Sequence, residues 1–186
     1  GIIKHEVPVV IASTQTATQA VFKEKAASQN APIYFADQLY HLHRTNNSNQ
    51  QFLEIEYTNA LGTLQKFQSD LTGIYQLKNI TGVLCAIDLL KEKFPKINNE
   101  IIASALSKVK SLTGLKGRWE VLSEKPLCIA DTGHNEDGIK QILTQLTFCD
   151  YENMHWVIGM VNDKDLNAVL ALLPKNASYY FILKTF

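Results

Sequence analysis

Short β-rich apolar runs alternate along this chain with longer stretches of helical periodicity. Residues 7–12 are predicted to form a buried strand, residues 13–29 a helix capped by Ser13 or Thr14, and residues 33–35 a second strand. The break between the helix and the second strand falls at Asn30-Ala31-Pro32. These elements form a βαβ unit, so the chain is predicted to belong to the α/β class.

The rest of the chain continues the mixed pattern. A hairpin is predicted from residues 52–57 and 63–67, with Gly62 in its loop. The further elements are predicted helices at 77–94, from 99 onward, 136–146 and 164–173, and predicted strands at 119–122, 127–130, 155–161 and 179–183. The predicted inner face of the helix at 77–94 consists of Ile80, Val83, Leu84, Ile87, Leu90 and Phe94. Residues 111–117, with two glycines, are the best linker candidate.

Composition excludes several classes of function. The 186 residues include 18 Lys and Arg against 18 Asp and Glu, a net charge of zero that argues against a DNA or RNA partner. No apolar run approaches the roughly 18 to 20 residues of a membrane-spanning helix, so no membrane partner is expected. The three cysteines lack C-x-x-C spacing and are predicted to be buried free thiols in a reducing compartment.

The most informative segment runs from residue 127 to residue 138. A predicted strand ends at Asp131, and a tight turn then leads to His134 and Asn135 at the start of a helix. Ligands of open α/β sheets bind at the carboxyl ends of strands, where Asp131 would lie. The strand at 155–161 ends similarly, in Asn162 and Asp163. The alternative is that these side chains only orient turns and cap helices.

Two other side chains are candidates for ligand binding. Arg118 stands between the linker and a strand, where its planar guanidinium suits a phosphate or carboxylate; the alternative is an ordinary surface arginine. Asn79 lies three residues after Gln76 in the first turn of a helix, where an amide offers a donor and an acceptor to a base edge. Helix capping is the alternative there.

Weaker signals come from histidines and aromatic residues. His41 and His43 would share one face of a strand, but no further residue with ligand spacing accompanies them, which disfavours zinc. The aromatic run 179–181 is predicted to lie in the core.

Five short motifs occur in the order in which one known family carries them. Gly1-Ile-Ile-Lys4 with Val7-Pro8-Val-Val is similar to G-I-I-K-x-G-x-P-V-V, and residues 73–79 are similar to G-x-x-Q-x-x-N. Residues 117–120 are similar to G-R-F-E, residues 131–135 to D-G-A-H-N, and residues 159–165 to a strand ending in D-K-D. Together they resemble the folylpolyglutamate synthase/dihydrofolate synthase family of the Mur ligase superfamily.

This resemblance implies two parts of an α/β fold. Residues 1–113 would be the tail of a Mur-ligase-type central ATPase domain, and residues 114–186 an incomplete Rossmann-like C-terminal domain. In the family the G-I-I-K motif lies well inside the central domain. The phosphate-binding loop and the magnesium ligands are therefore expected before Gly1, and the chain is expected to be a fragment that is inactive alone.

The resemblance also implies an activity. ATP, with Mg²⁺, would convert the carboxylate of a folate or dihydropteroate into an acyl phosphate, which the amine of L-glutamate then attacks. By position, Asn79 would contact adenine, Arg118 the ATP phosphates, and Asp131 the ribose or a domain-closing network, while His134 would lie near the glutamate or the acyl phosphate. Asp131 and His134 are the catalytic candidates, no residue here is expected to bind metal, and a cytoplasmic monomer is expected.

The sequence departs from the family pattern at two places in the D-G-A-H-N segment. Thr132-Gly133 replaces Gly-Ala, and Glu136 adds a negative charge where proline is usual, beside a site expected to receive anions. Two alternatives stay open. One is a peptidoglycan-precursor ligase of the same superfamily, and the other is a non-catalytic nucleotide-binding or interaction module, because no phosphate-binding loop occurs in the 186 residues.

Overall fold

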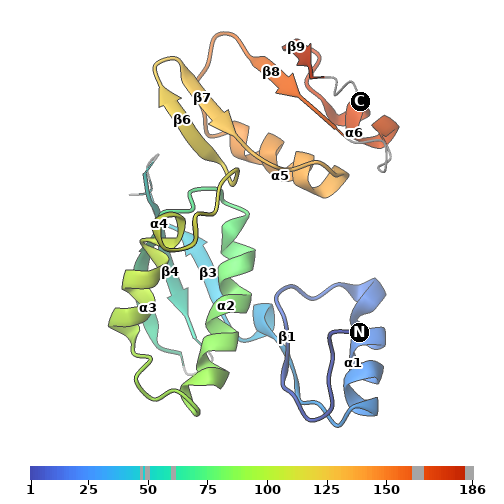
Figure 1. Cartoon of the computed structure of the whole chain (residues 1–186), viewed down its shortest axis with the longest axis vertical. Coiled ribbons are helices and arrows are strands. Elements are labelled where there is room, and N and C mark those ends of the chain that lie inside the picture. Colours follow the sequence, from blue (N-terminus) through green and yellow to red (C-terminus); the bar gives the residue numbers. More distant parts are fainter. Residues whose placement is uncertain (47, 49–50, 60–61, 161–165, 183–186) are drawn as a thin grey trace. The chain divides into compact units, whose positions relative to one another are not determined.

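The computed structural model describes residues 1–46, 48, 51–59, 62–160 and 166–182. The chain divides into two compact units, residues 1–116 and residues 117–186, and most of their helices and strands are labelled in Figure 1. The division falls inside the predicted linker. That linker is not irregular throughout, because helix α4 (Val109–Thr113) occupies its first part.

Unit 1 begins with the predicted βαβ arrangement. Strand β1 (Val9–Ile11), helix α1 (Thr16–Ser28) and strand β2 (Ile33–Phe35) follow one another, and the two strands pair in parallel, which confirms the prediction. The predicted cap is wrong, because Gln15 takes the N-cap position without a side-chain hydrogen bond. Thr14 is held elsewhere: its N–H and hydroxyl each donate to the Asp37 carboxylate, both at 2.7 Å.

A three-stranded antiparallel sheet follows the short 3₁₀ helix η1 (Ala36–Gln38). Its order is β3 (His41–Arg44), β4 (Leu53–Thr58) and β5 (Leu64–Ser69), so the predicted hairpin is confirmed and β3 extends it. His41 and His43 share the exposed face of β3. On that outer face, Glu56 pairs with His43 at 3.3 Å and with Lys66 at 2.5 Å.

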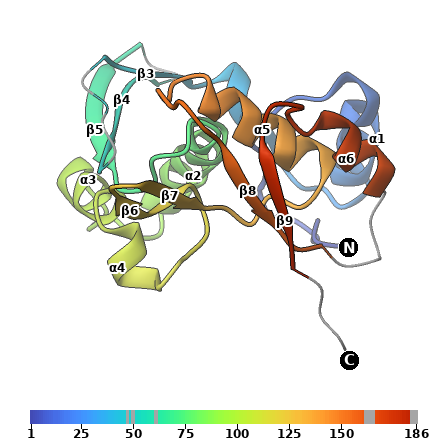
Figure 2. The same cartoon turned by 90° about the horizontal axis from the view of Figure 1, so that it is seen from above.

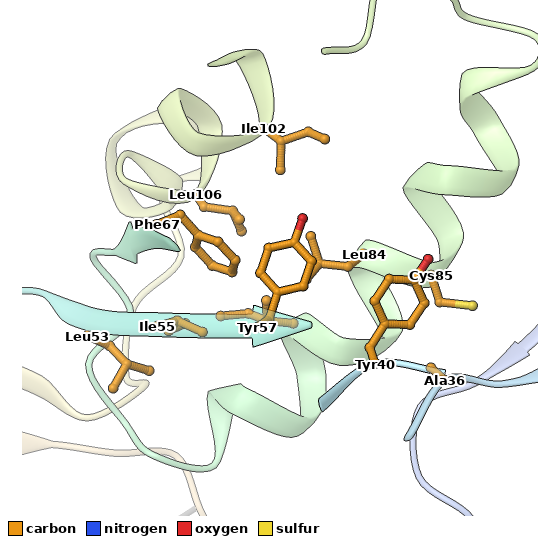
Figure 3. Close-up of a cluster of buried hydrophobic side chains, with 11 residues drawn as sticks. Ala36, Tyr40, Leu53, Ile55, Tyr57, Phe67, Leu84, Cys85, Ile102 and Leu106 are labelled. Carbon is orange, nitrogen blue, oxygen red and sulfur yellow. The ribbon is translucent and has the colours of Figure 1, made fainter. Parts of the chain in front are cut away.

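The core of unit 1 lies between this sheet and helices α2 (Gln76–Lys91) and α3 (Asn99–Leu106). Period-2 alternation turns Leu53, Ile55 and Tyr57 of β4 inward. The Tyr57 ring meets Phe67 of β5 edge-on, with centroids 5.4 Å apart. Figure 3 shows side chains of β4, β5, α2 and α3 in this core.

Only part of the predicted inner face of α2 is buried. Ile80 and Leu84 lie in the core, whereas Val83, Leu90 and Phe94 are exposed. The sheet of unit 1 covers one side of the helix, so the remaining apolar positions have no covering layer among the described residues. Local caps set the next two helices: Asn98 accepts from the Ile101 N–H at 2.9 Å, and the Asp70 carboxylate accepts from the first two N–H groups of α4.

Unit 2 combines an antiparallel hairpin with a parallel pair of strands. The hairpin is β6 (Glu120–Glu124) and β7 (Leu127–Ala130), and helix α5 (Glu136–Leu146) follows it. Strand β8 (His155–Ile158), helix α6 (Leu166–Leu172) and strand β9 (Ser178–Phe181) complete the unit. Figure 2 shows β8 and β9 side by side, and they pair in parallel. The buried core is Trp119, Ile139, Ile142 and Val169.

Several predicted environments differ from those observed. Tyr180 and Phe181 are exposed rather than buried, and Tyr179 is partly buried. Tyr180 and Phe181 point to opposite faces of β9, so described residues leave both faces open at this end of the strand. The thiols are free, but only Cys85 is buried, while Cys149 is partly buried and Cys128 is exposed. Across the described ranges, no helix has the length and apolar character needed to cross a membrane.

Candidate functional site

Asp131 lies immediately after β7 and holds two segments of unit 2 together. Its Oδ2 accepts from the Trp119 N–H and its Oδ1 from the Gly133 N–H, both at 2.8 Å. Trp119 has φ = +51°, a left-handed conformation that is uncommon for a bulky residue, and its side chain is only 5% exposed. Asp131 therefore holds the strained backbone of the buried Trp119 in place. Its carboxylate orients the turn, which is the structural role considered as the alternative to ligand binding.

Arg118 directly precedes Trp119 and is half-buried. One guanidinium nitrogen, Nη1, donates to the Gly117 carbonyl at 3.2 Å and to the Thr132 hydroxyl. Gly117 is fixed in turn: its N–H donates to Glu120 Oε2 at 2.7 Å, and its carbonyl accepts from the Thr132 N–H at 2.9 Å. Among the described residues, the other guanidinium donors have no hydrogen-bond partner. They can bind a phosphate or carboxylate.

His134 is exposed at the end of the same turn. Its Nδ1 lies 2.9 Å from the Thr132 carbonyl oxygen. A carbonyl can only accept, so Nδ1 carries the proton of the neutral ring and Nε2 is the basic nitrogen. Asn135 caps α5, since its Oδ1 accepts from the Gly138 N–H at 2.8 Å. Asn135 therefore has the structural role considered for it, whereas His134 presents a free proton acceptor.

Glycines let the turn pack directly on the first turn of α5. A Cβ on Gly133 would lie 2.8 Å from Ile142 Cδ1, and a Cβ on Gly138 would lie 3.0 Å from Gly133 Cα. Neither position has room for a side chain without displacement of its neighbour. This contact fixes the path of the backbone on which Asp131 and His134 are carried.

Asn79 lies in unit 1, in the first turn of α2. Its Nδ2 donates to Oε1 of the buried Gln76 at 2.8 Å, while Asn79 itself is exposed. The N-cap residue, Tyr75, forms no side-chain cap bond. The hydrogen bond between Gln76 and Asn79 joins two side-chain amides and does not cap the helix. Asn79 thus keeps an acceptor and a second N–H for a ligand.

Three of the four predicted site residues lie together in unit 2: Asp131 and His134 in the turn after β7, and Arg118 in the segment before β6 that is hydrogen-bonded to this turn. Asn162 and Asp163 lie outside the described residues. Two contributors were missed, Thr132 and Glu120; the three-residue separation of Gly117 and Glu120 was the available signal for the second. Within the described residues, no group of three or more His, Cys, Asp or Glu side chains could hold a metal ion, so no magnesium site is derived from them.

Comparison with known proteins finds a matching domain family for unit 2 and relatives along most of the chain. Residues 117–185 match the family described as Mur ligase, glutamate ligase domain. The dihydrofolate synthase/folylpolyglutamate synthase of Bacillus subtilis is 29% identical over 147 residues, 76% of this chain and 32% of that protein. The folylpolyglutamate synthase of Lacticaseibacillus casei is 25% identical over 185 residues, 98% of this chain and 42% of that protein. The chain is similar to folylpolyglutamate and dihydrofolate synthases, and its residues 117–185 match the Mur ligase glutamate ligase domain.

Solved structures show the same fold. A complex of a folylpolyglutamate synthase with AMPPCP and folate has a TM-score of 0.83 at 23% identity, over 97% of this chain and 43% of that one. Escherichia coli FolC with ADP has a TM-score of 0.74 at 21% identity. The predicted α/β class and the Rossmann-like Mur ligase C-terminal domain are therefore confirmed. The chain spans about a third to two fifths of the length of these two curated relatives.

Proposed function

We propose that the protein to which these residues belong is an ATP-dependent ligase that joins L-glutamate to a folate or dihydropteroate. The observation that carries the proposal is the turn of unit 2, where Arg118 and His134 are presented by a domain of the glutamate ligase type. We assign residues 1–113 to the end of a central ATP-binding domain and residues 114–186 to the C-terminal domain. A cytoplasmic, monomeric protein remains the expectation from the family.

The proposed reaction has two steps. The substrate carboxylate attacks the γ-phosphorus of ATP, so that an acyl phosphate forms and ADP leaves. The amine of L-glutamate then attacks the acyl carbon, the C–O bond to phosphate breaks with its electrons on the phosphate, and the amine loses a proton. Bringing several anions together demands fixed cations and exclusion of water. Mg²⁺ would add positive charge at the phosphates, through ligands outside those found here.

Each candidate residue receives a role suited to its surroundings. Arg118 would bind the ATP phosphates with the donors that have no partner among the described residues. His134 Nε2 would accept the proton of the attacking amine, because Nδ1 is engaged by a backbone carbonyl. Asn79 would offer its exposed amide to the adenine edge. We assign Asp131 a positioning role, because each of its oxygens accepts a backbone N–H group of the turn.

The additional negative charge of Glu136 does not oppose anion binding as strongly as its position suggests. Its Oε1 lies 2.5 Å from Lys140 Nζ, one turn further along α5. The pairing raises the pKa of Lys140 above its usual value, so the lysine stays protonated at neutral pH. Lys140, one turn further along α5, thus places a local cation beside the extra carboxylate.

We further propose that the 186 residues alone bind ATP weakly, in the high micromolar range or above, and have no ligase activity. The reason is that no Gly-x-x-x-x-Gly-Lys-Ser/Thr loop occurs in the sequence to surround a triphosphate. Isothermal titration calorimetry of the chain with ATP, with and without Mg²⁺, checks this. Tight, magnesium-dependent binding would contradict it.

The ligase assignment is tested with a hybrid enzyme. This chain replaces the matching C-terminal part of the Lacticaseibacillus casei synthase, which aligns with 98% of it. ADP release should require both a folate and L-glutamate. Arg118→Ala should abolish most of this activity, whereas Lys175→Ala, which removes an exposed cation elsewhere in unit 2, should not. A hybrid that binds ADP but turns over no folate would favour the non-catalytic module.

A peptidoglycan-precursor ligase is the second candidate. A UDP-N-acetylmuramoyl-L-alanyl-D-glutamate–2,6-diaminopimelate ligase of Helicobacter pylori is 35% identical over 74 residues, 40% of this chain. The two candidates differ in the acceptor whose carboxylate is phosphorylated. ADP release from the hybrid with a UDP-muramoyl peptide and not with a folate would favour this second candidate.

A further inference from the structure

We infer that Thr132 is a positioning residue for Arg118, and that its hydroxyl presets the guanidinium for a phosphate ligand. The inference rests on the proposed nucleotide role of Arg118. Thr132 is a position at which the sequence departs from the D-G-A-H-N motif. The motif has glycine there, which has no hydroxyl.

The hydroxyl of Thr132 lies between the two groups that it connects. Its Oγ1 donates to the Gly117 carbonyl at 3.2 Å and accepts a hydrogen bond from Arg118 Nη1. A hydroxyl has one donor and two acceptor sites, so both bonds can exist together. The arginine is thereby tied to a side chain 14 positions further along the chain.

The direction of the hydroxyl is itself restricted. Gly117 has φ = +66°, and a Cβ there would lie 2.5 Å from Thr132 Cγ2. The absent side chain of Gly117 thus provides the space that the threonine methyl group occupies. Threonine is β-branched and stiff at χ1, so packing of its methyl group also sets the direction of Oγ1.

The turn does not need this hydroxyl to form. The Thr132 N–H already donates to the Gly117 carbonyl at 2.9 Å, and the Asp131 carboxylate binds the backbone on both sides. Thr132 is exposed, so its hydroxyl is not a buried group that requires a partner. The distinctive effect of the hydroxyl is therefore on the guanidinium.

Fixing Nη1 changes what the guanidinium offers to a ligand. The Nε and Nη2 groups are the pair of donors that can bind two oxygens of one phosphate side by side. A guanidinium held before binding loses less conformational freedom when the ligand arrives, which strengthens binding. We expect loss of the hydroxyl to weaken binding of ADP or tripolyphosphate about three- to tenfold, the range for one hydrogen bond of typical net strength.

The test uses the 186-residue chain and nitrogen-detected NMR of its arginine side chains. The sequence contains only two arginines, Arg44 and Arg118, so Arg118→Ala identifies the Arg118 signals. Thr132→Val removes the hydroxyl and keeps the shape, and Thr132→Ser keeps the hydroxyl. Thr144→Val is the matched control, because the Thr144 hydroxyl donates only to a backbone carbonyl of its own helix, α5. ADP and tripolyphosphate are titrated into each variant.

The expected result has two parts. In the wild type and in Thr132→Ser, the Arg118 guanidinium should rotate slowly and give separate Nη signals; in Thr132→Val these signals should merge. The dissociation constants should rise about three- to tenfold in Thr132→Val, with recovery in Thr132→Ser and no change in Thr144→Val. Unchanged signals, or unchanged affinity, in a folded Thr132→Val chain would overturn the inference.

The proposed function can fail separately. If Arg118→Ala leaves both dissociation constants unchanged, Arg118 does not bind phosphate, and the nucleotide role is refuted together with the positioning that depends on it. If Arg118→Ala weakens binding and Thr132→Val does not, the nucleotide role stands and only the inference about Thr132 is refuted.

Discussion

Replacement of Asp131 by alanine should destabilise unit 2 selectively. The carboxylate accepts two backbone hydrogen bonds, from Trp119 and from Gly133, each at 2.8 Å. Removal of the side chain leaves both N–H groups without these acceptors. One of them belongs to a residue that is 5% exposed and has φ = +51°, so water cannot easily replace the lost oxygen there.

The magnitude follows from the two bonds. A hydrogen bond to a charged group contributes about 1.5 to 3 kcal/mol, and the Gly133 N–H, in an exposed turn, recovers part of its bond from water. We expect a loss of about 2 to 4 kcal/mol in the free energy of unfolding for Asp131→Ala. Asp131→Asn keeps one acceptor oxygen but points an NH₂ group at the other N–H, so we expect about half that loss.

Tryptophan fluorescence during urea denaturation measures this loss in unit 2 alone. The only two tryptophans of the chain, Trp119 and Trp156, both lie in that unit, in or against its core. With a slope of about 1 kcal/mol per molar urea, the midpoint for Asp131→Ala should fall by about 2 M or more. Asp150→Ala, at an exposed carboxylate elsewhere in the unit, should shift it little.

The reasoning is refuted if Asp131→Ala unfolds at the wild-type urea concentration. The Asp131 carboxylate would then contribute little to the stability of the turn, and a direct contact with the nucleotide would become the better explanation of its presence. The same chain, titrated with ADP, would show whether affinity is lost while stability is kept.

Three further predictions concern Tyr40 and the cysteines. Tyr40→Phe should lower the free energy of unfolding of unit 1 by about 1 to 2 kcal/mol, followed by circular dichroism at 222 nm, because the Tyr40 hydroxyl donates to Asp88 at 2.5 Å. Burial and, to a smaller extent, the nearby Asp88 charge raise the pKa of the Cys85 thiol. The neutral thiol therefore stabilises unit 1 below the pKa of the unfolded thiol, and this stabilisation is lost at higher pH. The urea midpoint of unit 1 should fall above about pH 9. A thiol reagent at neutral pH should modify the exposed Cys128 first and Cys85 only on unfolding; rapid modification of Cys85 in the native chain would contradict its burial.

Elements with local signals were predicted closely. Helix α5 begins and ends where the sequence placed it, since Asn135 caps it and its apolar spacing is regular. The cap of α1 was misplaced because the side chain of Thr14 binds Asp37, 23 positions away. No local pattern contains that partner.

Burial was harder to predict than secondary structure. The spacing of Val83, Leu90 and Phe94 matches an inner helix face, and Tyr180 and Phe181 lie in a β-rich run, yet all five side chains are exposed. Apolar spacing indicates which side of an element is suited to burial. Whether another layer covers that side depends on what packs against it, and described residues cover only part of these surfaces.

The sequence by itself determined the α/β class, the order of the motifs and the turn that carries Asp131 and His134. These depend on residues close together along the chain. Only the tertiary structure decided what Asp131 and Thr132 do. The register of β6 and β7, which pairs Glu120 with Ala130, brings residues 117–119 against residues 131–133, so that backbone and side-chain groups of one segment become the hydrogen-bond partners of the other.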